Sequence, residues 1–100
     1  MTSFAQMVAA DRRLLILKAL AAAAEYTAAR RLLIAFLSSW GRRVSSDVVA
    51  GDLAWLAEQG LVELRNAGEE SIGKLTDRGL DVAEGRANCP GVRRPAPGED

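Results

Sequence analysis

Apolar residues recur at helical spacing over two stretches of the first 40 residues. A helix is expected over residues 4–24, because Ser3 and Gln6 have the spacing of a capping box at its start. A second helix is expected from Thr27, as its N-terminal cap, to about Trp40. Each segment carries a broad apolar face, so both helices are predicted to contribute to one core.

A third helix is predicted between two serines and a glycine, followed directly by a β-hairpin. Ser45 or Ser46 can accept hydrogen bonds from the free N–H groups of the first turn, and Gly60 supplies a left-handed residue at the end. The residues after Gly60 then favour strands at 61–65 and 71–75 around a glycine-containing turn.

A short final helix is predicted over residues 77–84, with Thr76 as its cap and Gly85 as its stop. Beyond it, three prolines and two glycines interrupt regular structure. We therefore expect one domain over residues 1–88 and a flexible Pro/Gly-rich tail over residues 89–100.

The helical and strand periodicities converge on one set of inward-facing positions. The predicted core consists of Leu17, Leu20, Leu33, Phe36, Leu37, Leu53, Leu56, Val62 and Leu80. Trp55 is expected to be partly buried at the edge of this core. Gly51 costs about 1 kcal/mol relative to alanine inside a helix. The expected reason is packing against another helix of the fold, and close approach by a ligand is the alternative.

Composition excludes several classes of protein. One hundred residues fit one domain, half of them apolar and a quarter charged, and no apolar run is long enough to cross a bilayer. The N-terminus has no secretory pattern, so a cytoplasmic location is expected. A single cysteine, Cys89, and no histidine exclude an internal disulfide and a nitrogen and sulfur metal site. No catalytic constellation is recognisable, so neither enzyme activity nor a cofactor is expected.

Charged residues balance, with 13 cations and 13 anions, so the chain lacks the positive excess of many DNA-binding domains. Arg42 and Arg43 precede the third helix, where guanidinium groups and free N–H groups together attract phosphate. Arg30 and Arg31, in the first turn of the second helix, either reinforce that contact or are solvated surface residues. Residues 44–64 contain no Lys or Arg, so base-reading side chains are scarce there.

An apolar stripe also marks the N-terminal turns of the first helix. Phe4, Met7 and Val8 recur at helical spacing, and Asp11 then interrupts the stripe and marks either a break or a second cap. These three apolar residues either join the core or pair with a second copy of the chain. We predict the second arrangement, with Phe4, Met7 and Val8 at the interface of a homodimer.

The order helix, helix, helix, hairpin, helix resembles a winged-helix family of small proteins from Mu-like transposable phages and prophages, commonly labelled ArsR-like regulators. The resemblance covers residues 1–94, and its most specific parts are DLAWLAEQGLV at residues 52–62 and LTDRGLDVAEG at residues 75–85. It implies a mainly α fold with a small β-hairpin, a winged helix-turn-helix. Related sequences carry basic residues where this chain has Ser46, Val48 and Ala50. Metal sensing is not implied, because the ligands of such sensors are absent.

The resemblance implies a phage-type winged-helix protein that binds double-stranded DNA and acts in transcriptional regulation or in handling phage DNA. Its expected contact residues are Arg42, Arg43, Ser45 and Ser46, with Arg30 and Arg31 beside them. Because these cations are few, weak and salt-dependent binding is expected. The alternative is an adaptor that binds another phage protein during assembly, without binding DNA, through its third helix and apolar N-terminal segment.

Overall fold

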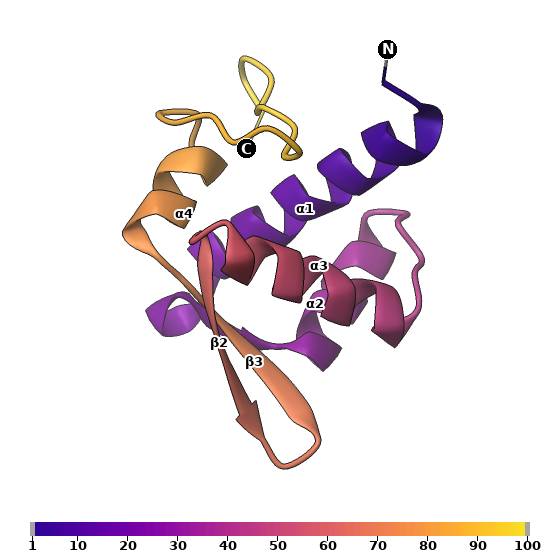
Figure 1. Ribbon diagram of the computed structural model, residues 1–100, viewed down its shortest axis with the longest axis vertical. Coiled ribbons are helices and arrows are strands. Elements are labelled where there is room, and N and C mark those ends of the chain that lie inside the picture. The colour runs from indigo at the N-terminus through magenta and orange to yellow at the C-terminus, as the bar shows by residue number, and fades with distance from the viewer. Residues whose placement is uncertain (1, 100) are drawn as a thin grey trace.

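Four α-helices, one short 3-10 helix and a three-stranded antiparallel sheet form the part of the chain described by the computed structural model, residues 2–99 (Figure 1). In chain order the elements are α1 (Phe4–Ala22), η1 (Ala24–Tyr26), β1 (Thr27–Ala29), α2 (Arg30–Ser39), α3 (Ser46–Glu58), β2 (Val62–Ala67), β3 (Glu70–Leu75) and α4 (Asp77–Ala83). The sheet order is β1, β3, β2. None of the helices within residues 2–99 is long and apolar enough to cross a membrane.

The start of α1 forms as the sequence predicts. The Ser3 hydroxyl accepts a hydrogen bond from the Gln6 backbone N–H, and the Gln6 side chain accepts one from the Ser3 N–H. This capping box satisfies two N–H groups that the helix itself leaves free. The helix runs without interruption past Asp11 and ends at Ala22, two residues earlier than predicted.

The segment before α2 differs from the prediction, because Thr27 begins a strand and does not cap a helix. Glu25 and Tyr26 adopt positive φ angles of 55° and 57°, which turn the chain out of α1. Residues 27–29 then pair with β3, with Thr27 opposite Lys74. The sheet therefore has a third strand beyond the predicted hairpin.

The third helix and the elements after it follow the predicted signals closely. The Ser45 hydroxyl accepts a hydrogen bond from the Val48 N–H and so caps α3, while Gly60 has a φ of 76° just beyond the helix. Strands β2 and β3 pair as an antiparallel hairpin. The Thr76 hydroxyl caps α4 by accepting a hydrogen bond from the Gly79 N–H.

The core lies between α1, α2, α3 and one face of the sheet. Of the predicted core positions, Phe36 and Leu80 are half-buried and all the others are buried. Trp40 is 52% exposed, because it lies at the C-terminal cap of α2 and not on its inner face. The packing explanation for Gly51 is wrong, since a Cβ built there has no atom within 4 Å.

The C-terminal segment packs against α1, although the sequence analysis separates residues 89–100 from the domain. Cys89 and Val92 are buried, and the Arg93 N–H donates to the Ala10 carbonyl oxygen at 3.1 Å. Apart from turns, residues 89–99 have no regular secondary structure, as their prolines and glycines predict. Residues after 88 therefore contribute to the core.

A candidate nucleic-acid interface at the starts of α2 and α3

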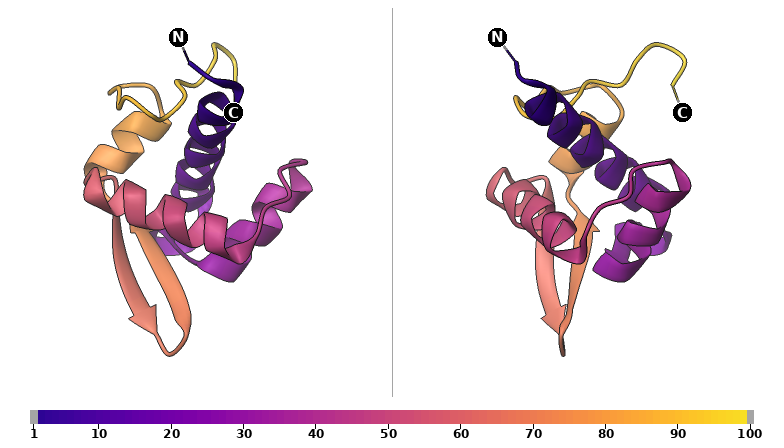
Figure 2. Two further views of the ribbon diagram at one scale, coloured as in Figure 1. Left: turned by 45° about the vertical axis from the view of Figure 1, so that its right-hand side comes forward. Right: turned by 90° about the vertical axis from the view of Figure 1, so that its right-hand side faces the viewer.

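The first turns of α2 and α3 lie side by side next to the hairpin formed by β2 and β3 (Figures 1 and 2). The first turn of α2 carries Arg30 and Arg31, and the first turn of α3 follows Ser45 and begins with Ser46. Helix starts attract anions, because their N–H groups lack intrahelical partners. The fold thus places four of the predicted contact residues on one side of the molecule.

The two arginines of the loop before α3 have different environments. Arg42 Nε donates to an Asp11 carboxylate oxygen at 2.9 Å, and Arg42 Nη1 donates to the Trp40 carbonyl oxygen at 2.6 Å. Arg43 is exposed and makes no ion pair within residues 2–99. Arg43 is therefore the member of the pair that is free to meet a phosphate.

Asp11 holds Arg42 because its carboxylate stays charged in the fold. Burial alone raises the pKa of Asp11, but hydrogen bonds and charge from Arg42 and Arg93 outweigh it and lower the pKa below the ordinary value. Arg93 Nε lies 3.0 Å from Asp11 on the side of the C-terminal segment. Because Asp11 also attracts Arg42, this carboxylate reduces the positive potential beside α3.

The tip of the hairpin formed by β2 and β3 supplies one carboxylate and one backbone carbonyl oxygen to the start of α2. Ala29, the N-cap residue of α2, makes no side-chain cap, and the Arg31 N–H instead donates to the Glu70 carboxylate at 3.3 Å. Arg30 Nη2 lies 3.4 Å from the Glu69 carbonyl oxygen. A phosphate near this helix start must therefore compete with Glu70. Alanine has no side-chain acceptor that can cap a helix, so Ala29 was a sequence signal that another group accepts a hydrogen bond from the first turn of α2.

The outward face of α3 carries no cation. Its exposed positions opposite the core are Asp47, Gly51, Ala54 and Glu58, which recur at helical spacing, and Ser46 and Val48 are exposed beside them in the first turn. Arg, Lys, Asn and Gln, which read base edges in the major groove, are absent from these positions. The start of α3 therefore offers hydrogen-bond donors to an anion, whereas its outward face offers no side chain of the kind that reads bases.

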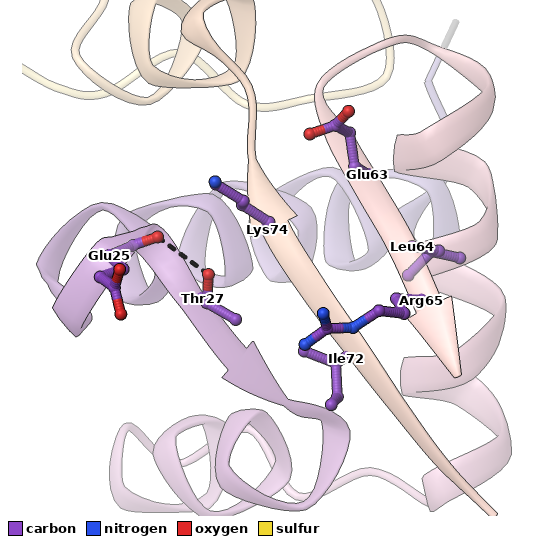
Figure 3. A pocket seen from close by; sticks show the side chains of 7 residues that line it. All are labelled: Glu25, Thr27, Glu63, Leu64, Arg65, Ile72 and Lys74. Carbon is purple, nitrogen blue, oxygen red and sulfur yellow. Dashed lines mark hydrogen bonds between the residues drawn. The ribbon is translucent and has the colours of Figure 1, made fainter. Parts of the chain in front are cut away.

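A hollow of about 460 Å³ lies on the outer face of the sheet (Figure 3). It is lined by Glu25, Thr27, Glu63, Leu64, Arg65, Ile72 and Lys74. Lys74 lies opposite Glu63 in the strand register, and Arg65 lies opposite Ile72. Cations and carboxylates alternate here, as is typical of a sheet face that meets water. The hollow does not concentrate positive charge, and we do not assign the nucleic-acid interface to it.

The predicted dimer residues lie at the other end of the molecule, on the first turns of α1. Phe4 is 80% exposed, Met7 58% and Val8 39%, so none of them belongs to the core of the single chain. Figure 2 shows these turns extending away from the sheet. The fold leaves this predicted surface exposed, and its last residue, Val8, lines one hollow with Arg42 and Arg43 of the loop before α3.

Comparison with known proteins places the chain among phage proteins. It is 47% identical over 87 residues to the uncharacterized protein gp26 of Escherichia phage Mu, a match that covers 87% of this chain and 90% of gp26. The chain belongs to the family of phage Mu gp26. It is also 30% identical over 96 residues to an uncharacterized protein of Haemophilus influenzae, covering 95% of this chain and 91% of that protein. No family model and no solved structure matches the chain.

Proposed function

We propose that this member of the gp26 family is a winged-helix protein that binds double-stranded DNA through phosphate contacts. In this interpretation α2 and α3 form the helix-turn-helix, and β2 and β3 form the wing. The order of these elements and the adjacent starts of α2 and α3 support the proposal (Figure 1). Membership of a phage family makes phage DNA the natural target. The protein acts as a regulator or as a DNA-handling factor.

One observation carries the proposal: the guanidinium groups of Arg31 and Arg43 form no ion pair within residues 2–99 and flank two helix starts. Arg30 adds a third cation, whose guanidinium group, among the described residues, hydrogen-bonds to the Glu69 carbonyl oxygen and forms no ion pair. Guanidinium groups bind phosphate oxygens in pairs, and helix starts add further donors. Because Arg42 beside them is already paired with Asp11, three cations remain for phosphate at these helix starts within residues 2–99, and the binding is weak and largely independent of sequence.

Titrations with a random duplex at several salt concentrations test this proposal. Two to three phosphate contacts give a slope of log affinity against log salt of about −2 to −3. Changing Arg31 and Arg43 together to alanine removes two contacts and flattens that slope by about 2.

The matched control is Arg78→Ala with Arg94→Ala. It removes the same charge from exposed positions on α4 and the C-terminal segment. This variant is expected to retain the slope of the intact chain. Equal losses of affinity in both double variants would mean that only net charge matters, and the assigned surface would then be wrong.

A protein-binding adaptor is the second candidate, and the outward face of α3 favours it. Asp47 and Glu58 lie at the two ends of that face, with Gly51 and Ala54 between them and no cation on it. Such a surface repels phosphate and permits a partner protein to approach closely. If the intact chain binds no duplex even at low salt, the adaptor function replaces DNA binding.

A further inference from the structure

Two exposed apolar stripes consist of side chains other than the arginines proposed above to bind DNA. The α1 stripe consists of Phe4, Met7 and Val8. The α2 stripe consists of Leu32, Phe36 and Trp40, which recur every four residues along one side of the helix. Together we name these six residues the α1–α2 apolar face.

The α2 stripe is a preformed apolar surface. Leu32 is 58% exposed and Trp40 52% exposed, and half-buried Phe36 lies between them. The rings of Phe36 and Trp40 have centroids 6.1 Å apart in a tilted arrangement, which holds Trp40 against its own helix. A partner that covers this stripe therefore meets aromatic rings that already contact each other.

The two stripes meet at the ion pair between Asp11 and Arg42. Asp11 follows the α1 stripe on the same side of the helix, one turn beyond Val8. Arg42 pairs with Asp11 and donates to the carbonyl oxygen of Trp40, the last residue of the α2 stripe. Val8 and Arg42 also line one shallow hollow. The ion pair therefore joins the two stripes into one band.

The area of this face is comparable with the largest apolar patch of a typical single chain, about 300–600 Å². A fully exposed aromatic side chain presents about 150–250 Å², so the fractions given above leave roughly 500 Å² of apolar surface exposed on each copy. Two such faces in contact bury roughly 1,000 Å² from these side chains alone. This reaches the area that a specific protein interface requires.

The charge pattern indicates which partner fits. Residues 2–10 and 32–41 contain no Asp, Glu, Lys or Arg. A surface that recognises its partner by charge complementarity carries charged residues, and these two segments carry none. A two-fold interface brings identical groups close together, so an uncharged face avoids repulsion between like charges. A formal net charge of zero likewise leaves no long-range repulsion between two copies.

We propose that the α1–α2 apolar face binds a second copy of this chain about a two-fold axis. The α1 stripe of each copy lies against the α2 stripe of the other. The Asp11–Arg42 pairs of the two copies then come to the centre of the interface, where each pair has no net charge because its two groups neutralise each other. This arrangement extends the predicted dimer interface from Phe4, Met7 and Val8 to α2. It does not depend on DNA binding, since it uses different side chains.

Sedimentation of the intact chain over about 1–100 µM measures the dimerisation directly. The expected result is a monomer at the low end and a dimer at the high end. Phe4→Ser with Met7→Ser in one variant, and Leu32→Ser with Trp40→Ser in another, are each expected to weaken the dimer at least tenfold. Leu64→Ser is the matched control, because Leu64 is 41% exposed outside this face, and it is expected to dimerise like the intact chain.

Mixing the two double variants tests the pairing of stripes. In a dimer of either variant alone, each of the two contacts between an α1 stripe and an α2 stripe contains one damaged stripe. In the mixed dimer, one of the two contacts has both of its stripes intact. The mixed dimer is therefore expected to be tighter than either variant alone. A mixed dimer no tighter than the variants overturns the pairing of α1 with α2.

Fluorescence of Trp40 provides a second measurement without any change to the stripes. In a Trp55→Phe background, the emission of Trp40 is expected to shift to shorter wavelength as the dimer forms, because its ring loses water. A chain that stays monomeric at all concentrations, with unchanged emission, overturns the proposal. The face then belongs to a different partner.

Discussion

Gly51 and Gly79 both lie in helices, yet the space around their α-carbons differs. A Cβ at Gly51 has no atom within 4 Å, whereas a Cβ at Gly79 would lie 2.1 Å from the Leu61 carbonyl oxygen. Gly79 is therefore required by the close approach of α4 to the chain before β2. Within the single chain, no close contact requires glycine at position 51, and Gly51 weakens α3 through its own backbone flexibility.

Alanine substitutions at these two glycines are expected to have opposite effects. Gly51→Ala should raise the free energy of unfolding by about 0.5–1 kcal/mol, because alanine loses less backbone freedom in a helix. Gly79→Ala should lower it by about 1–3 kcal/mol, since the methyl group overlaps backbone atoms. Urea unfolding of both variants gives the two values. A destabilised Gly51→Ala variant would show that α3 tolerates no side chain at that position.

Arg42 and Arg43 show which features of the site the sequence could predict. Their positions before α3 follow from local signals, namely the end of α2 and the cap at Ser45. The partner of Arg42 is Asp11, which lies 31 residues away in the chain. Contacts over such separations depend on how α1 packs against α2, and no local pattern encodes them. The sequence therefore indicated the arginine pair without showing which arginine is free.

At the scale of elements, the C-terminal segment is attached to α1 by a chain of ion pairs. Arg93 lies between Asp11 and Glu99, at 3.0 Å and 2.9 Å, and Lys18 Nζ lies 3.0 Å from Glu99. Hydrogen bonds from Arg93, and then from the Ala96 N–H, lower the pKa of Glu99 far below its ordinary value. The charged form of Glu99 is therefore the form that the fold stabilises.

This attachment predicts a dependence of stability on pH. Since the folded pKa values of Asp11 and Glu99 are lowered, their contribution is present above the ordinary carboxylate range and is lost as the pH falls below about 4. Glu99→Gln should be less stable than the intact chain at pH 7, and the difference should shrink towards pH 2. Urea unfolding at pH 7, 5, 3 and 2 measures it. A difference that stays constant over this range would show that Glu99 does not act through its charge.

Most of the helices and strands could be predicted from local sequence signals. The helix caps at Ser3, Ser45 and Thr76 and the hairpin follow from signals within a few residues, and all of them form as expected. Strand β1 has only three residues, Thr-Ala-Ala, and it exists because β3, more than 40 residues later, offers a free edge. Such pairing is not visible in a local pattern.

At the scale of the whole molecule, the free cations lie beside the exposed apolar side chains, since Leu32 follows Arg31 in the first turn of α2 and Arg43 lines one hollow with Val8 and Arg42. Arg31 and Arg43 flank the starts of α2 and α3, whereas the α1 stripe lies on the turns that extend away from the sheet (Figure 2). A dimer through the α1–α2 apolar face carries two such sets of arginines. Two such sets double the phosphate contacts available to one duplex.

An NMR titration of the nitrogen-15 labelled chain with a short random duplex at low salt locates the DNA surface most directly. The proposed function predicts that the amide signals of Arg31, Arg43 and the first turn of α3 shift with added DNA, and that those of α4 do not. The shifts should reverse when salt is added, because phosphate contacts release counterions. If no amide signal shifts, or if the largest shifts fall on α4 or the outer face of the sheet, DNA binding through this surface is contradicted.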